Sequence, residues 1–159
     1  MIRKIIKISI VLLCMTIIFL FSSDNATESN KKSDGVIINM CKLFTGHDLN
    51  SKEKKNYIGK YVVYVRKSAH FMIYLILGIS LISLIGEYRQ LDIKAIIIAL
   101  TIAILYAISD EIHQLFVSGR SGEILDVFID SIGSIMGVSI YYLLSKIRRN
   151  TNEQKKAIS

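Results

Sequence analysis

Four long apolar runs separated by polar segments dominate the hydrophobic pattern of this chain. They lie at about 5–21, 69–86, 93–111 and 123–145. A helix needs about 20 mostly apolar residues, at a rise of 1.5 Å per residue, to cross the roughly 30 Å hydrocarbon core of a bilayer. The pattern therefore predicts an all-α membrane protein with four transmembrane helices, and we expect residues 1–159 to form a single domain.

The segment between the first two runs carries two sets of apolar residues at helical spacing. Asn50, followed three residues later by Glu53, fits a capping box that opens a helix at the second set. Aromatic hydroxyls in this set suit the depth of the membrane interface. We therefore expect amphipathic interfacial helices within residues 35–66. The two sets are Val36, Ile37, Met40, Cys41, Leu43 and Phe44, and Tyr57, Ile58, Tyr61, Val62, Tyr64 and Val65.

Ionisable and polar side chains lie within or at the ends of the later three runs. A charged side chain at the centre of a membrane helix costs at least about 2.5–3.5 kcal/mol, so such residues are usually paired or functional. Because complementary groups occur at corresponding ends of the runs, we expect one shared polar site near one membrane surface. The candidate site residues are Lys67, His70, Tyr74, Asp110, Glu111, Gln114, Arg120, Asp126 and Asp130.

Helical periodicity places several of these residues on common faces. One stripe consists of Lys67, His70, Tyr74 and Gly78, and another of Asp126, Asp130, Gly133 and Gly137. Small residues allow neighbouring transmembrane helices to approach closely. Since glycines continue the acidic stripe, both aspartates are predicted to face the interior of the bundle rather than lipid.

Three kinds of chemistry could use these side chains. Arg120 with Lys67 would hold a phosphate or a carboxylate, because a guanidinium offers a planar bidentate fork. The carboxylates with His70 would bind a divalent cation, or His70 paired with a carboxylate would act as a general base. A purely structural network of neutralised charges is the remaining alternative. The catalytic candidates are His70, Asp110, Glu111, Asp126 and Asp130, with His47 and His113 as weaker ones.

Basic residues beside the runs predict the orientation in the membrane. They flank the outer ends of the first and last runs, so the positive-inside rule places both termini in the cytoplasm and the polar site outside. The lysines of the first loop conflict with this assignment. The net charge of +7 fits helix flanks that contact anionic headgroups, and no nucleic-acid-binding motif is present. The flanking residues are Arg3, Lys4 and Lys7, and Lys146, Arg148 and Arg149.

The polar motifs resemble those of VanZ-like membrane proteins. The segment 109–120 (SDEIHQLFVSGR), followed by Asp126, Asp130 and Gly133, is similar to the longest signature of the family. The segment 66–74 (RKSAHFMIY) is similar to its lysine–histidine–tyrosine motif, and 21–23 (FSS) to a third mark. Asp24 stands where many members have Gln. The resemblance covers about residues 5–145.

This resemblance implies a small bacterial protein of the cytoplasmic membrane, whose founding relative is associated with low-level teicoplanin resistance. It does not supply a mechanism. Our leading hypothesis is that an outward-facing pocket binds an anionic envelope molecule, such as a lipid-linked phosphate or a lipoglycopeptide. Arg120 would contact the anion, while Asp126 and Asp130 would position Arg120 or a bound cation. The alternatives are a membrane enzyme that acts on a lipid headgroup and a non-catalytic scaffold. No cofactor is firmly predicted, although a divalent cation is a candidate.

Overall fold

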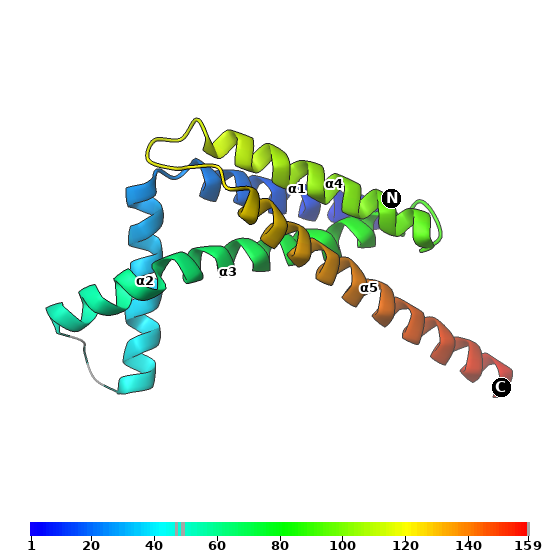
Figure 1. The fold of residues 1–159 in the computed structure, drawn as a ribbon. Coiled ribbons are helices and arrows are strands. Elements are labelled where there is room, and N and C mark those ends of the chain that lie inside the picture. The colour runs from blue at the N-terminus through cyan, green and yellow to red at the C-terminus, as the bar shows by residue number, and fades with distance from the viewer. Residues whose placement is uncertain (47, 49, 159) are drawn as a thin grey trace.

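The structure, a computed structural model, describes residues 1–46, 48 and 50–158 and is built from α-helices (Figure 1). In chain order they are α1 (Ile2–Ser23), α2 (Ala26–Thr45), α3 (Ser51–Ile85), α4 (Ile93–Gln114) and α5 (Ile124–Ile158). No strand occurs among the described residues. The predicted all-α fold is confirmed.

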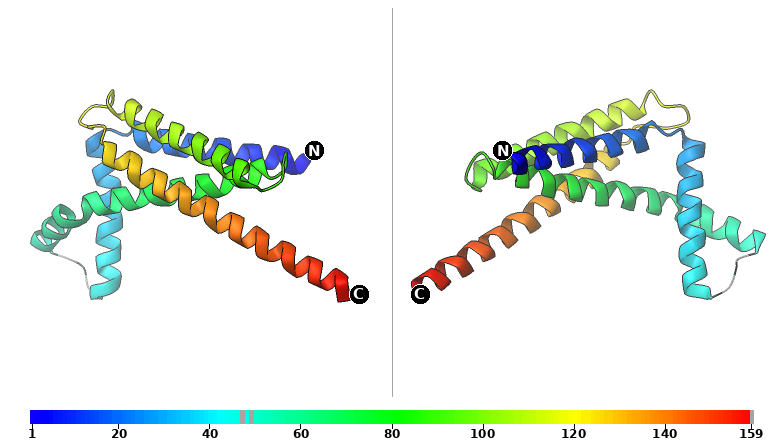
Figure 2. Two further views of the ribbon diagram at one scale, coloured as in Figure 1. Left: turned by 45° about the vertical axis from the view of Figure 1, so that its right-hand side comes forward. Right: turned by 180° about the vertical axis from the view of Figure 1, so that it is seen from behind.

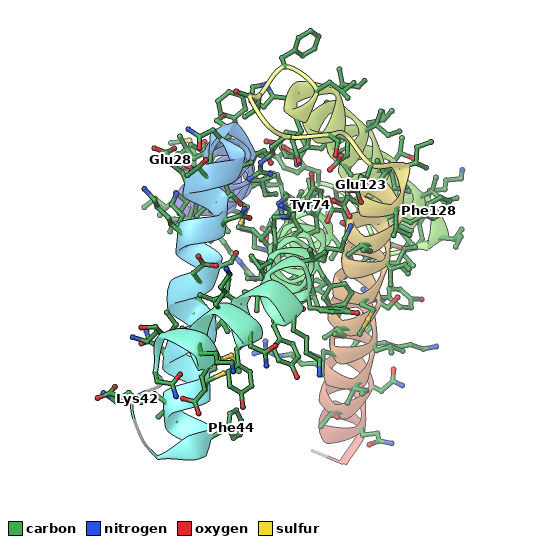
Figure 3. All side chains as sticks on the ribbon, turned by 60° about the vertical axis from the view of Figure 1, so that its left-hand side comes forward. Glu28, Lys42, Phe44, Tyr74, Glu123 and Phe128 are labelled. Carbon is green, nitrogen blue, oxygen red and sulfur yellow. The ribbon has the colours of Figure 1, made fainter. Side chains whose placement is uncertain are left out.

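Four of these helices are long and apolar enough to cross a membrane: α1, α3, α4 and the Ile124–Thr151 part of α5. No more than 33% of any of these apolar segments is buried within the protein. Leu105 is 61% exposed and Phe128 is 62% exposed, and Figure 3 shows Phe128 projecting away from the other helices. Apolar surfaces of this extent need a lipid environment. The prediction of four transmembrane helices is confirmed.

The second span is part of a longer helix than the apolar run alone predicts. α3 begins at Ser51, where Asn50 and Glu53 form the expected capping box, and continues without interruption to Ile85. Neither Gly nor Pro occurs between Gly59 and Gly78, so the backbone has no residue that would end the helix. The tyrosine-rich set is therefore the extramembrane extension of the second span and not a separate helix.

The other interfacial helix, α2, starts earlier than expected. Its N-cap is Asn25, whose side chain accepts a hydrogen bond of 2.9 Å from the backbone N–H of Glu28. Gly46 ends the helix in the left-handed conformation, with φ of 72°, which glycine adopts without steric cost. Figures 1 and 2 show α2 lying crosswise to α1 and α4. In a membrane spanned by those two helices, α2 lies along one surface.

Helices α3 and α5 pack backbone to backbone through glycines. A Cβ atom added at Gly78 would lie 2.5 Å from the carbonyl oxygen of Ser134, and one added at Gly133 would lie 2.5 Å from the carbonyl oxygen of Phe71. A Cβ at Gly137 would meet the carbonyl oxygen of Leu75. The glycine stripe predicted from the sequence therefore forms a helix–helix interface.

Alanines give α4 its buried face. Ala95, Ala99, Ala103 and Ala107 recur at intervals of four residues and are fully buried. Small side chains at this spacing let neighbouring helices approach closely. The same face continues into the last turns of α4, so its polar residues point inward as well.

The two chain ends lie at one end of the bundle. Figures 1 and 2 show the start of α1 and the end of α5 opposite the connection of residues 115–123. An even number of spans requires both termini to be on one side of the membrane. The end of the bundle with the connection of residues 115–123 lies at the other side.

Candidate functional site

The predicted site residues converge where α4 ends and α5 begins. The inner face of α4 carries Asp110, Glu111 and Gln114, each no more than 6% exposed. α3 contributes Lys67 and His70, which face the start of α5. Arg120 lies in the connection between α4 and α5. The observed pairs are Lys67 with Asp126, His70 with Asp130, and Arg120 with Gln114. Distant parts of the chain thus form one polar cluster.

The outer part of this cluster is an ion-pair group around Lys67. Its ammonium pairs with Asp126 and, at 3.0 Å, with Glu123. Glu123 was not among the residues predicted from the sequence, because it stands at the very start of the last run and not within it. Asp126 lies in the first turn of α5 and Glu123 directly precedes this helix, so Lys67 links α3 to that helix end.

The centre of the cluster is more deeply buried. The Nδ1 atom of His70 lies 3.7 Å from Oδ2 of Asp130, and one ligand atom from each of His70, Asp110 and Asp130 lies within 4.8 Å of the others. Asp130 and Tyr74 are both 0% exposed. Neither the Asp130 carboxylate oxygens nor the Tyr74 hydroxyl has a hydrogen-bond partner among the described residues. Figure 3 shows Tyr74 inside the bundle.

Arg120 binds the end of α1 and the end of α4. Its Nε donates to the carbonyl oxygen of Asp24, and its two terminal nitrogens donate to the carbonyl oxygen of Phe21 and to Oε1 of Gln114, each at 3.0 Å. In turn, Nε2 of Gln114 donates to Oε1 of Glu111 at 3.0 Å. Arg120 therefore fixes the connection against two helices.

The serines at the end of α1 also contact this group. Ser22 is fully buried, and its hydroxyl donates to Oδ2 of Asp110 at 2.8 Å. Ser23 Oγ lies 3.1 Å from Nε2 of His113, on the outside of the bundle. The backbone N–H of Glu123 donates to Oε2 of Glu111 at 2.9 Å. Residues 21–23, 66–74 and 109–130 thus meet at one place.

These are the three segments that carry the sequence resemblance, and a family comparison covers all of them. The family model described as VanZ/LLP1 matches residues 7–145. The chain belongs to the VanZ/LLP1 family. No curated protein and no solved structure matches it significantly. Membership accounts for the shared motifs, and the hydrogen bonds above give them a physical role in this VanZ/LLP1 chain.

A cavity of about 210 Å³ opens beside the polar cluster, between α1, α2 and α3. Its polar lining includes Arg66, Arg120, His70, and Lys32, which pairs with Asp24 at 2.5 Å. Burial and the neighbouring charge of Arg66 both lower the pKa of the Arg120 guanidinium from its usual value. Two arginine side chains therefore lie close together at this cavity.

A larger groove of about 720 Å³ continues from this cavity between α2 and α3. The two spaces share Val36, Val65 and Ala69. The groove is lined mainly by apolar and tyrosine side chains, including Phe44 and Tyr61. In this VanZ/LLP1 chain, a largely apolar cavity that carries the basic side chains of Lys32, Arg66 and Arg120 thus runs into an apolar groove.

One predicted relationship within the site is not observed. Asp126 and Asp130 were expected to position Arg120, but Asp126 pairs with Lys67, and Arg120 forms no ion pair among the described residues. The reason is geometric: carbonyl groups at the end of α1 and the amide of Gln114 accept hydrogen bonds from three of the five N–H groups of the guanidinium. His47 lies outside the described residues.

Several residues that line the cavity were not predicted from the sequence. Arg66 lies four positions before His70, so helical spacing puts the two on one face, and this spacing could have identified it. Lys32 had no such signal, because α2 was not expected to begin before residue 35, and Asp24 was noted only as a departure from the family motif. Ser22 was recognised only as part of a motif.

Proposed function

We propose that this protein binds an anionic amphiphile, with its charged group in the cavity between α1, α2 and α3 and its acyl chain in the adjoining groove. The observation that supports this most is the pair of arginines at the cavity, Arg66 and Arg120. Neither forms an ion pair among the described residues. Two neighbouring cations repel each other, and an anion between them would relieve that repulsion.

The apolar groove determines which kind of anion is favoured. Burial of one CH₂ group stabilises a complex by about 0.8 kcal/mol, so a hydrocarbon chain in the groove would contribute much of the affinity. The tyrosines along α3, Tyr57, Tyr61 and Tyr64, suit the boundary between headgroups and hydrocarbon. A lipid-linked phosphate and an acylated glycopeptide both combine an anionic group with such a chain.

The orientation and biological role follow from this proposal. Basic flanks at both chain ends favour cytoplasmic termini, which would expose the cavity on the outer side of the membrane. An outward-facing protein that binds envelope amphiphiles would contribute to envelope homeostasis or, for a lipoglycopeptide, to resistance against teicoplanin. The minimum inhibitory concentration of teicoplanin, with and without expression of the protein, measures the second role.

Binding should be measured on the full-length protein in nanodiscs, with a polyisoprenyl phosphate in one arm and teicoplanin in the other. Loss of a charge-assisted contact costs about 1.5–3 kcal/mol, so Arg66→Ala should weaken binding about 10–100-fold. Arg149→Ala, at the exposed far end of α5, is the matched control and should bind like the wild type.

Arg66→Ala is the more informative of the two arginine variants. The Arg66 side chain forms no hydrogen bond within the described residues, whereas the Arg120 side chain binds two helix ends, so Arg120→Ala also perturbs the fold. Equal affinity of the wild type and Arg66→Ala for both ligands would reject the proposal. Tighter binding of the polyisoprenyl phosphate or of teicoplanin shows which of the two kinds of anionic amphiphile the protein prefers.

Chemistry on the bound headgroup is a second candidate, because His70 lines the same cavity and lies 3.7 Å from Asp130. A histidine beside a carboxylate can act as a general base. Release of inorganic phosphate from the polyisoprenyl phosphate distinguishes an enzyme from a binding protein.

A further inference from the structure

A trio made of the partly buried His70 and the buried Asp110 and Asp130 is not explained by anion binding. The three side chains come from α3, α4 and α5, and one ligand atom of each lies within 4.8 Å of the other two. Asp110 is 4% exposed and Asp130 is 0% exposed. Two carboxylates and an imidazole therefore share a small space inside the bundle.

The contacts within the protein leave this trio unsatisfied. Both carboxylate oxygens of Asp130 and Nδ1 of His70 are buried without a hydrogen-bond partner among the described residues. The separation of 3.7 Å between Nδ1 and Oδ2 is too long for a hydrogen bond. A buried carboxylate without a partner is energetically unfavourable unless a cation or a proton neutralises it.

Neighbouring cations do not fill this role. Lys67 is engaged by Asp126 and Glu123, and Arg120 is bound to carbonyl and amide oxygens. Glu111 is not part of the trio, because its oxygens accept hydrogen bonds from Gln114 and from the backbone N–H of Glu123. The trio thus contains two carboxylates with one histidine as their nearest base.

We propose that His70, Asp110 and Asp130 bind a divalent metal ion through Nδ1 and the two carboxylates. One imidazole and two carboxylates suit Mn²⁺ or Zn²⁺, and two carboxylates balance the charge of a divalent ion. Ligand atoms bound about 2.0–2.2 Å from one ion lie roughly 3 to 4 Å apart. The His70–Asp130 separation of 3.7 Å falls in this range.

Two further features favour a metal over a simple acid–base contact. The Oδ2 atom of Asp110 accepts hydrogen bonds from Ser22 at 2.8 Å and from Gln114 at 3.4 Å, and such outer contacts orient metal-ligating carboxylates. The other carboxylate oxygen of Asp110 accepts no hydrogen bond within the described residues. The trio comes from three helices, so a bound ion would also join them.

The test uses full-length protein that has been purified in detergent, treated with a chelator and titrated with Mn²⁺. Loss of the electron paramagnetic resonance signal of free Mn²⁺ reports binding, and about one ion per chain is expected. Loss of an outer contact already lowers metal affinity about 10–100-fold. Asp130→Asn removes a direct ligand, so it should lower the affinity by more than about 100-fold.

Asp126→Asn is the matched control, since Asp126 lies one turn earlier on α5 and pairs with Lys67. It should keep wild-type affinity, as should Arg66→Ala, which separates this proposal from anion binding. Equal Mn²⁺ affinity in Asp130→Asn and the wild type would overturn the proposal. If Asp130→Asn does not fold, Co²⁺ added to the wild type decides: visible d–d absorption of bound Co²⁺ supports the site, and its absence overturns it.

Discussion

At the scale of single residues, the end of α1 owes its position to a few buried hydrogen bonds. The hydroxyl of Ser22 reaches across to Asp110, and the carbonyl oxygens of Phe21 and Asp24 bind Arg120. A sequence shows which of these residues are polar but not which partner each selects. For this reason the clustering of acids and bases could be predicted, whereas the pairing of Arg120 could not.

Ser22→Ala should destabilise the protein, because it removes a donor from a buried carboxylate. Leaving a buried acceptor without its partner costs about 1–3 kcal/mol. Ser23→Ala is the control: Ser23 is exposed and donates to the carbonyl oxygen of Phe19 in its own helix. Thermal unfolding in detergent should show a lower midpoint for Ser22→Ala only. Equal midpoints for the two variants would contradict the assigned contact.

At the scale of helices, close packing depends on small residues, and only some of these could be recognised from the sequence. Glycines in α5 were recognisable, because glycine is unfavourable in a helix interior unless something requires it. The alanines of α4 gave no comparable signal, since alanine is apolar and favours helices anyway. The boundaries of α2 and α3 were misjudged for a related reason: their amphipathic turns lie outside the bilayer, where hydropathy does not mark the helix ends.

Gly133→Ala should force α3 and α5 apart. The added methyl group would lie 2.5 Å from the carbonyl oxygen of Phe71, and overpacking of this kind costs about 1–3 kcal/mol. Gly59→Ala is a suitable comparison, because nothing lies within 4 Å of a Cβ at Gly59. There, the higher helix propensity of alanine should raise stability slightly. A Gly133→Ala protein that unfolds at the wild-type temperature would disprove close contact.

At the scale of the whole molecule, the chain ends and the connection of residues 115–123 lie at opposite ends of the bundle (Figure 2), and the polar cluster lies at the end with this connection. This separation could be predicted from the sequence. The flanking lysines and arginines lie at the outer ends of the first and last runs, whereas the acids and bases of the site lie where the third run ends and the fourth begins. It did not predict the cavity, whose walls include residues of α2. A cavity between helices depends on how they cross, and hydropathy carries no information about crossing.

Cysteine labelling tests the predicted orientation. Phe116 lies in the connection at the polar end and is 83% exposed. In a variant without Cys14 and Cys41, Phe116→Cys should react with a membrane-impermeant maleimide added to intact cells. Lys146→Cys, near the end of the last span, should react only after the cells are permeabilised. The reverse pattern would place the cavity in the cytoplasm.

The backbone contact of α3 with α5 also affects which ion the buried trio would accept. His70 and Asp130 lie beside Phe71 and Gly133, where the two helices touch and cannot separate without breaking the interface. Ca²⁺ requires six to eight oxygen ligands at about 2.3–2.6 Å. Because the contact between α3 and α5 prevents the ligands from moving apart to fit this larger ion, the trio would bind small divalent ions in preference to Ca²⁺.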